Sequence, residues 1–496
     1  MRGQKDYENL AEHLKRITAL EQVMGLLGWD QETQMPPKGA AQRAEQAGAV
    51  AAALHAATAD PRIADWCDAI DTDGAPAHVA VNVAEARTLH RRATRTPEKL
   101  AVELARQASK TLVVWQETRK TSNFAGYAPA LSELIDLKRE QAKCLAEEAE
   151  TPYDALLSQF EPGTTSAELD TIFSRLRDGL VSLRQRIAET GISPPNFTGE
   201  FPADRQIAFS RKLGDIFGYD WDAGRLDLAV HPSSNGSGGD VRITTRINPT
   251  QPLECIYSTI HELGHAVYEQ NLNPEHAMLP VASHASMGVH ESQSRLFENQ
   301  IGRGRAFCGW LHDAMLARFG PTGLDSAEDL YRAANAVETG YIRTEADEVH
   351  YNLHILMRFD LERALISGDL PVADLETAWN ARFEADFGLK VPDALRGVMQ
   401  DIHWADGLFG YFPTYTLGNI YAGCLNRAIH ADMPDIDMAL AEGETQGVVA
   451  WLNRNIHNRG RMVPPKQLIT DATGFEPDET PLLAYLETKF SGLYPI

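Results

Sequence analysis

The stretch His261–His265 (HELGH) constrains this chain most, because it places two histidines and a glutamate inside an apolar run that should be helical. Pro252 suits the first helical position, since the N–H that proline lacks would be unpaired there in any case. Inside the run only Gly264 weakens a helix, by about 1 kcal/mol relative to alanine. His261 and His265 would therefore lie one turn apart on one face, with Cβ atoms roughly 5–6 Å from each other.

Two imidazoles at this spacing can each reach one metal ion at about 2 Å. Glu262 would lie beside them, close enough to contact a water on that metal but not to displace a histidine. This arrangement is typical of a metallohydrolase. A chain with 16 histidines can also contain the pattern by chance, so other residues have to support the interpretation.

A catalytic zinc site usually has three protein ligands and keeps a fourth position for water. Downstream of His265, the candidates for the third ligand are His290, Glu291 and Glu298. A carboxylate ligand would give the two-histidine, one-carboxylate set of metallopeptidases. Alternatively, Glu291 and Arg295 could form a surface ion pair at i, i+4, worth only about 0.2–0.5 kcal/mol.

Composition limits the partners of this 496-residue chain. Its net charge of −23 argues against nucleic acid and against an anionic membrane, because both require a basic face. The five cysteines are far apart and form no C-x-x-C, so we expect a reducing compartment and neither a disulfide framework nor a cysteine zinc site. We expect no signal peptide, since the first twenty residues have no apolar core, and no apolar run is long enough to span a bilayer. The sequence thus predicts a cytoplasmic protein.

Helical patterns cover most of the chain. Apolar spacing predicts helices over residues 6–27, 40–58, 97–122 and 130–150, and a long helix after a capping box at Thr165–Glu168. In the first helix the repeating apolar residues are Leu10, Leu14, Ile17, Leu20 and Val23. Thr96 and Pro97 are predicted as N-cap and first residue of the third helix. Nothing separates independent domains, so we expect a single helical domain over residues 1–496.

One region departs from the helical pattern. Residues 225–231 and 240–247 both alternate as strands do, and the turn-rich segment 233–239 lies between them. This predicts a β-hairpin at about 225–247, directly before the HELGH helix. Such a sheet could pair its backbone with an extended peptide. The alternative is a surface hairpin without a function.

Several further motifs make the resemblance to one family specific. The chain resembles the M32 family of metallocarboxypeptidases, the Taq carboxypeptidase type, over nearly its whole length. Besides HELGH, the matching stretches are Trp29–Pro37, Arg43–Gln46, Asp240–Thr244, His290–Arg295, Ile342–Asp347, Gly397–Trp404 and Gly410–Asn419. One departure is His231-Pro232-Ser233, where the family has an aromatic residue after the proline.

The resemblance implies a mainly α-helical gluzincin with a deep active-site cleft and a small antiparallel β-sheet beside the HELGH helix. It implies that His261, His265 and Glu291 bind one divalent ion per subunit, Zn²⁺ or alternatively Co²⁺, and that Glu262 is the general base. The implied activity is the release of single C-terminal amino acids from peptides, with broad specificity. The family is usually homodimeric.

A carboxypeptidase must also bind the terminal carboxylate, and a bidentate arginine suits that task. Arg343 is the expected anchor and Arg242 the second choice; the alternative for Arg343 is a helix-surface pair with Asp347. The oxyanion of the tetrahedral intermediate could be stabilised by a phenol or an imidazole.

The expected oxyanion residues are Tyr415 and His403, with Tyr411 behind them, although aromatic residues in such a context often belong to the core. His231 is expected to bind substrate, with the packing of its loop altered by Ser233.

Two other functions compete with this interpretation. A helical zinc oligopeptidase or dipeptidyl carboxypeptidase would share the metal site but would not need an anchor one residue beyond the scissile bond. A non-catalytic helical peptide-binding protein would not need Glu262, and the presence of that residue argues against it.

Overall fold

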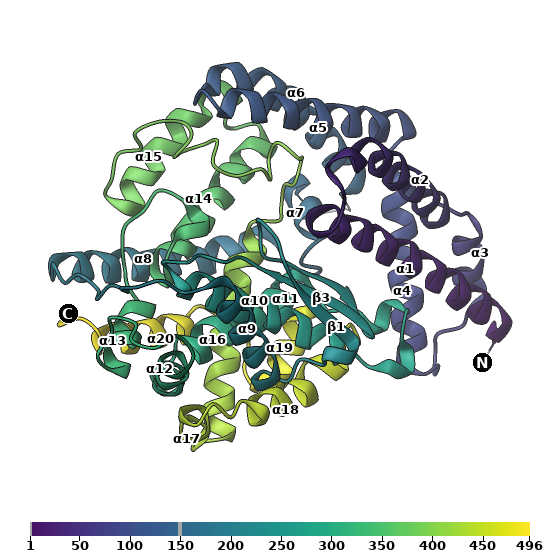
Figure 1. Ribbon diagram of the computed structural model, residues 1–496. Coiled ribbons are helices and arrows are strands. Elements are labelled where there is room, and N and C mark those ends of the chain that lie inside the picture. The colour runs from purple at the N-terminus through teal and green to yellow at the C-terminus, as the bar shows by residue number, and fades with distance from the viewer. Residues whose placement is uncertain (1, 147–150) are drawn as a thin grey trace. The chain divides into compact units, whose positions relative to one another are not determined.

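Helices dominate the computed structural model, which describes residues 2–146 and 151–496 (Figure 1). The mainly α-helical fold with a small sheet is the predicted one. Among the described residues, no helix is long and apolar enough to cross a membrane.

The chain forms two compact units, each assembled from three separate segments. The first unit contains residues 1–94, 195–334 and 422–476, and the second contains residues 95–194, 335–421 and 477–496. Because both units are discontinuous in sequence, neither is a simple sequential domain. The expectation of one domain over residues 1–496 stays a prediction.

The first unit holds four N-terminal helices, the sheet and the helices around it. Its helices are α1 Gln4–Thr33, α2 Ala40–Thr58, α3 Arg62–Ala69, α4 Ala77–Arg95, α9 Ala203–Ile216, α10 Pro252–Gln270, α11 Met287–Arg295, the π-helix η5 Leu296–Gly302, α12 Arg305–Phe319, α13 Ala327–Ala334, α17 Ile436–Ala441, α18 Gln446–Asn455 and α19 Pro465–Thr473. Its 3₁₀ turns are η1 Pro37–Gly39, η2 Trp221–Ala223, η3 Pro274–His276, η4 Pro280–Ala282 and η8 His457–Arg459.

The second unit is entirely helical among the residues described. Its helices are α5 Glu98–Arg119, α6 Phe124–Leu145, α7 Pro152–Leu157, α8 Ser166–Glu189, α14 Glu348–Ser367, α15 Leu375–Phe387 and α20 Thr480–Ser491, with 3₁₀ turns η6 Arg343–Glu345 and η7 Val372–Asp374. The boundary between the units falls inside α16 Pro413–Asp432.

Most helices predicted from apolar spacing are present. The capping box is confirmed: the Glu168 N–H donates to Thr165 Oγ1 (3.3 Å), and the Thr165 N–H donates to the Glu168 carboxylate (3.1 Å). In α1, Leu10, Leu14 and Ile17 are buried as expected.

Some details of the helix predictions differ. Val23 on α1 is 41% exposed. Pro97 is the N-cap of α5, so the prediction that Thr96 caps this helix is wrong. Residues 147–150, the end of the helix predicted over 130–150, lie outside the described residues.

The sheet is mixed, and the predicted antiparallel hairpin of residues 225–231 with 240–247 is therefore wrong in its pairing. β1 Gly224–Leu228 and β3 Asp240–Thr245 are neighbours but run parallel, and β2 Ser234–Ser237 pairs antiparallel with β3 on its other edge. The segment expected to be the loop supplies this third strand. Its turn is Gly238–Gly239, and the positive φ of Gly238 (63°) is readily adopted by glycine.

The long helix α10 is central to the first unit. Thirteen of its residues are buried, and it packs against β3, α9, α11 and η5 (Figure 1). Pro252 is its first residue, as predicted. A helix covered on so many sides holds its side chains rigidly, which is what a metal site requires.

Candidate metal centre and carboxylate-binding cluster

Two helices of the first unit bring three potential metal ligands together. His261 and His265 project from one face of α10, and Glu291 comes from α11. One ligand atom from each of the three lies within 4.8 Å of the other two. Glu291 Oε2 is 3.4 Å from Nε2 of His265 and 3.9 Å from Nε2 of His261. In a tetrahedral zinc site with bonds of about 2.05 Å, ligand atoms are separated by roughly 3.3 Å, so these side chains fit one ion.

Glu298 on η5 orients one of the ligands. Nδ1 of His261 lies 2.9 Å from Glu298 Oε2, which leaves Nε2 directed at Glu291. Hydrogen bonding of the second ring nitrogen to a carboxylate fixes the orientation of a histidine ligand and makes it more basic. Among the residues described, Nδ1 of His265 is buried without a hydrogen-bond partner.

The electrostatics keep two of the three donors, His265 and Glu291, in the states that a cation needs. Burial lowers the pKa of His265 to about 3, so its imidazole is neutral. Burial acts to raise the pKa of Glu291, but Arg295 and His261 outweigh it and the pKa is lowered, so the carboxylate is charged. Metal ligands are neutral imidazoles and ionised carboxylates.

The ion pair of Glu291 with Arg295 is also present, but it does not compete with the metal site. Arg295 Nε donates to Glu291 Oε1 (2.6 Å), while Oε2 faces the histidines. The pair is buried, with Glu291 only 7% exposed. A carboxylate can serve both roles because each of its oxygens has its own lone pairs.

Gly264 allows α11 to approach α10 closely enough for Glu291 to reach the histidines. A Cβ at this position would lie 2.5 Å from the Gln293 carbonyl oxygen and 2.5 Å from the Ser294 Cα. No side chain can occupy that space without displacing backbone. Sequence reasoning treated Gly264 only as a weak point of the helix and missed this role.

Glu262 is buried beside the ligands. It is 6% exposed, and burial raises its pKa to about 7. A carboxylate with a pKa near the working pH can take up a proton and release it again, which suits a general base.

The other two residues expected in this unit lie on or near the sheet. Arg242 on β3 donates through Nε and Nη2 to the Asp240 carboxylate (2.8 and 2.9 Å), and its guanidinium lies 4.3 Å from the centroid of the Trp29 ring. His231 is exposed in the segment between β1 and β2. Arg242 is thus already held by a carboxylate, which leaves it less suited to bind a second one.

The second unit gathers the remaining expected residues in one cluster. Arg343 donates through Nε and Nη2 to Asp401 Oδ1 (3.0 and 2.9 Å), and its guanidinium lies 5.3 Å from the ring centroid of Tyr415. His403 Nε2 is 3.3 Å from the Tyr415 hydroxyl. Arg343, His403 and Tyr415 therefore lie together, although 72 residues separate the first from the last.

Arg343 is not the helix-surface residue of the alternative interpretation. It is only 7% exposed and pairs with Asp401, while Asp347 caps α14 and contacts Nδ1 of His350 (2.7 Å). Asp401 also binds Arg358, whose Nη2 is 2.6 Å from Oδ2. Two guanidiniums share one carboxylate, so the cluster carries an excess positive charge that a second carboxylate can neutralise.

His403 is neutral in this cluster, because burial lowers its pKa to about 4. A neutral imidazole next to a phenol can donate or accept a hydrogen bond without adding charge. Sequence reasoning missed Asp401 and Arg358, although Asp401 stands two positions before His403 in a motif already singled out.

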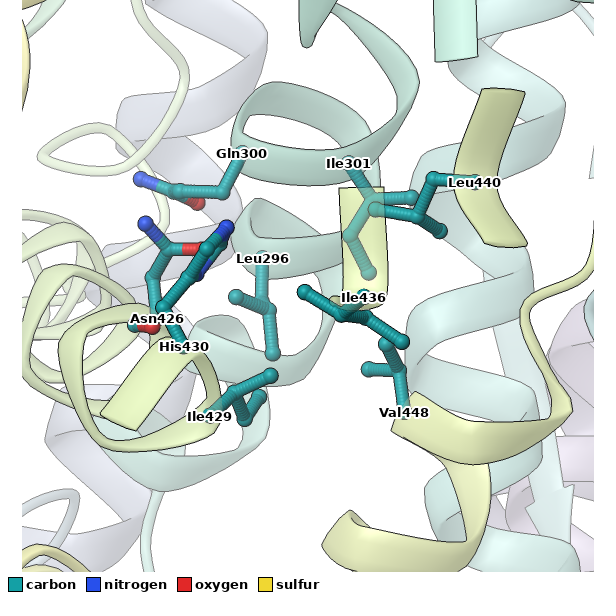
Figure 2. A pocket seen from close by; sticks show the side chains of 9 residues that line it. All are labelled: Leu296, Gln300, Ile301, Asn426, Ile429, His430, Ile436, Leu440 and Val448. Carbon is teal, nitrogen blue, oxygen red and sulfur yellow. Dashed lines mark hydrogen bonds between the residues drawn. The ribbon is translucent and has the colours of Figure 1, made fainter. Parts of the chain in front are cut away.

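The π-helix η5 also borders a cavity of the first unit (Figure 2). The lining residues are Leu296, Gln300, Ile301, Asn426, Ile429, His430, Ile436, Leu440 and Val448. In Figure 2 the polar ends of Gln300, Asn426 and His430 gather on one side, opposite the aliphatic side chains. Neither histidine of the metal set nor Glu291 lines it, so the cavity is no part of the metal centre.

Two histidines and a glutamate whose ligand atoms converge, with a buried glutamate beside them, are the side chains of a metal-dependent peptidase of the HExxH class. The family model described as Carboxypeptidase Taq (M32) metallopeptidase matches residues 9–490, and the chain belongs to this family. It is a metallocarboxypeptidase, and hence a hydrolase.

Named relatives are similar to this chain over nearly their full lengths. Thermostable carboxypeptidase 1 of Thermus thermophilus is 41% identical over 505 residues, covering 98% of this chain and 99% of the relative. Carboxypeptidase 1 of Bacillus subtilis is 35% identical, with 97% of each chain covered. The crystal structure of the M32 carboxypeptidase from Deinococcus radiodurans R1 superposes with a TM-score of 0.96 at 35% identity, covering 99% of this chain and all of the other.

Proposed function

We propose that this chain is a zinc-dependent carboxypeptidase that removes single amino acids from the C-termini of peptides with broad specificity. The observation that carries the proposal is the convergence of His261, His265 and Glu291 next to the buried Glu262. Co²⁺ is the alternative ion, because nitrogen and oxygen donors of this type also suit other divalent first-row metals.

Each side chain has a proposed role in peptide hydrolysis. A divalent ion held by the three ligands would supply an activated water near neutral pH and would polarise the scissile carbonyl. Glu262 accepts the proton of the attacking water and delivers it to the leaving amine. Glu298 holds the His261 ring through the hydrogen bond to Nδ1, so that Nε2 would be available to hold the ion.

The cluster of the second unit is proposed to act on the substrate itself. Arg343 binds the terminal carboxylate, with its orientation held by Asp401. Tyr415 and His403 stabilise the oxyanion of the tetrahedral intermediate through hydrogen bonds. Arg242 and His231 are proposed to contribute to substrate binding, with Arg242 in the weaker position because it already binds Asp240.

The decisive experiment is the digestion of an unmodified peptide, read by mass spectrometry as a function of time. We expect a ladder of single-residue losses from the C-terminus that a chelator stops and added Zn²⁺ restores. The same peptide with a C-terminal amide should resist cleavage. Cleavage of the amide at the rate of the free acid, or internal cleavage, would favour an oligopeptidase.

The variant Glu262→Gln separates catalysis from mere binding. We expect kcat to fall by about 10²–10⁴ with one Zn²⁺ still bound at this site, since the general base is lost and the ligands are not. A variant that kept the wild-type rate would contradict the role of Glu262 and leave a peptide-binding protein as the better description.

We also propose that the enzyme is a cytoplasmic homodimer. The dimer rests on the resemblance to the family, and the location rests on the five scattered cysteines, which form no C-x-x-C. Sedimentation of the purified protein tests the first point, and fractionation of cells that express it tests the second. A monomer at micromolar concentration would contradict the dimer.

A further inference from the structure

A second group of metal-binding side chains lies in the first unit, next to the catalytic set but made of different residues. Glu269 on α10, His284 in the segment before α11 and His290 on α11 each offer a ligand atom within 4.8 Å of the others. His284 Nδ1 is 2.9 Å and His290 Nε2 is 3.0 Å from the same oxygen, Glu269 Oε1. We infer that this group is a second divalent cation site with a His₂Glu ligand set that suits Zn²⁺.

The spacing along α10 explains why two sites can stand side by side. His261, His265 and Glu269 follow one another at intervals of four residues, so all three project from one face of the helix. The next helix supplies neighbouring residues to different sites, Glu291 to the first and His290 to the second. The rings of His265 and His290 stack at 4.4 Å between centroids, which fixes the two ligand sets against each other.

The ligand atoms are nearly in place for an ion. A tetrahedral zinc site separates its ligand atoms by roughly 3.3 Å, and the two measured separations from Glu269 Oε1 are 2.9 and 3.0 Å. For these two pairs, only a few tenths of an ångström of outward movement would be needed. Glu269 is 6% exposed, and a buried carboxylate is favourable when a cation compensates its charge.

Two backbone hydrogen bonds hold the segment that carries His284 in position. The His284 carbonyl oxygen accepts a hydrogen bond from Arg461 Nε (3.1 Å), and the following N–H, that of Ala285, donates to the Tyr268 hydroxyl (3.1 Å). The positive charge of Arg461 opposes a cation, but Arg461 is paired with Glu85 at 2.9 Å. The segment that carries His284 is therefore preorganised against the end of α10.

The second ion would act as a structural clamp. No ligand is shared between the two groups, so the ions would not form a bridged pair. A bound ion would tie α11 and the preceding segment to the last turn of α10. Because Glu291 directly follows His290, the clamp would also hold the third ligand of the catalytic site.

The test is the number of Zn²⁺ ions bound by the full-length protein after chelation and equilibrium dialysis against Zn²⁺, measured by mass spectrometry of the metal. Wild type should bind two ions per chain, His284→Ala should bind one, and Glu269→Gln should also lose the second. His261→Ala should lose the first ion only, which separates the failure of this inference from the failure of the catalytic assignment. The exposed residue His55 provides the control His55→Ala, which should bind two.

A second measurement, the absorption spectrum of the Co²⁺-substituted protein, tests the same site independently. Replacement of Zn²⁺ by Co²⁺ should give visible absorption bands for two ions in wild type, and His284→Ala should lack the contribution of one. The inference is overturned if wild type binds a single ion that His261→Ala loses. It is also overturned if both His284→Ala and Glu269→Gln retain two ions.

Discussion

At the scale of single residues, the metal centre depends on the hydrogen bonds that two proposed ligands, Glu291 and His261, make to neighbouring side chains. Glu291 gives one oxygen to Arg295 and turns the other to the histidines. His261 gives Nδ1 to Glu298, which in turn contacts Arg303 at 3.2 Å. These contacts fix the directions of Glu291 and His261 before any ion arrives, which lowers the conformational cost of binding it.

Removal of the contact from Glu298 should weaken metal binding. We expect Glu298→Ala to lower the affinity for Zn²⁺ by about 10–100-fold, because His261 loses the partner that orients it. Glu298→Gln should lie between this variant and wild type, since an amide oxygen can still accept from Nδ1. Competition with a chromogenic chelator measures the affinity, and Glu275→Ala on the exposed 3₁₀ turn η3 is the control. Equal affinities of all four proteins would refute the role of Glu298.

Replacement of the Arg343 guanidinium should remove the preference for substrates with a free C-terminus. We expect Arg343→Lys to lower kcat/KM on an unblocked peptide by roughly 100-fold, equivalent to about 3 kcal/mol, because lysine keeps the charge but cannot bind a carboxylate bidentately. The ratio of rates on the acid and the amide should fall toward one.

Arg396→Lys is the matched control for Arg343→Lys. Arg396 lies in the same unit and also binds an aspartate, Asp393, but its side chain is 51% exposed. This variant should keep both the rate and the preference of wild type. If Arg343→Lys still strongly preferred the free acid, a residue other than Arg343 would have to bind the terminal carboxylate.

At the scale of elements, the close approach of α10 and α11 decides whether the metal set can form. The two helices meet where Gly264 faces the backbone of Gln293 and Ser294. The π-helix η5 continues from α11 without interruption and carries Glu298 to His261. π-helical turns are rare and are often found at functional sites, where they redirect side chains.

A methyl group at the contact between α10 and α11 should separate the two helices. We expect Gly264→Ala to destabilise the protein by about 1–3 kcal/mol and to weaken Zn²⁺ binding, because overpacking against backbone cannot be relieved by a rotamer change. Gly48→Ala inside α2 is the matched control, since its Cβ would meet nothing within 4 Å. That control should stabilise by up to about 1 kcal/mol through helix propensity. Urea denaturation and metal titration of both variants test this, and an unaffected Gly264→Ala would contradict it.

At the scale of the whole molecule, a buried carboxyl should make stability depend on pH. Glu362 in the second unit accepts hydrogen bonds from Trp404 Nε1 (2.8 Å), the Tyr153 hydroxyl (2.8 Å) and the Gly410 N–H (3.1 Å). Burial nevertheless raises its pKa from an ordinary 4.5 to about 7. Between these two values the unfolded chain has released the proton and the folded protein still holds it.

The sign of the effect follows from this difference in bound protons. Stability falls as pH rises through the window from about 4.5 to 7, by about 3 kcal/mol for this group. Glu362→Gln should lack that part of the slope when urea midpoints are compared at pH 5 and pH 8. Glu384→Gln, at an exposed position on α15, should keep the slope of wild type. Parallel pH profiles of wild type and Glu362→Gln would contradict the prediction.

The sequence by itself determined the class of protein, the placement of His261 and His265 one turn apart on a helix, and the presence of the helices predicted from apolar spacing. These features depend on short-range order: the i, i+4 spacing of His261 and His265, the capping box at Thr165, and the apolar period of α1. Such patterns act within one or two turns, so they can be read without knowledge of the fold.

Only the tertiary structure decided which distant residues meet. Parallel pairing of β1 with β3 depends on the path of the chain through β2, and the strands' own alternation is the same for either direction. The partner of Arg343 is Asp401 rather than the nearby Asp347, because burial brings together charges that lie far apart in the chain. The role of Gly264 likewise cannot be predicted from the sequence alone. It depends on the backbone of α11, which lies where a side chain at this position would have to be.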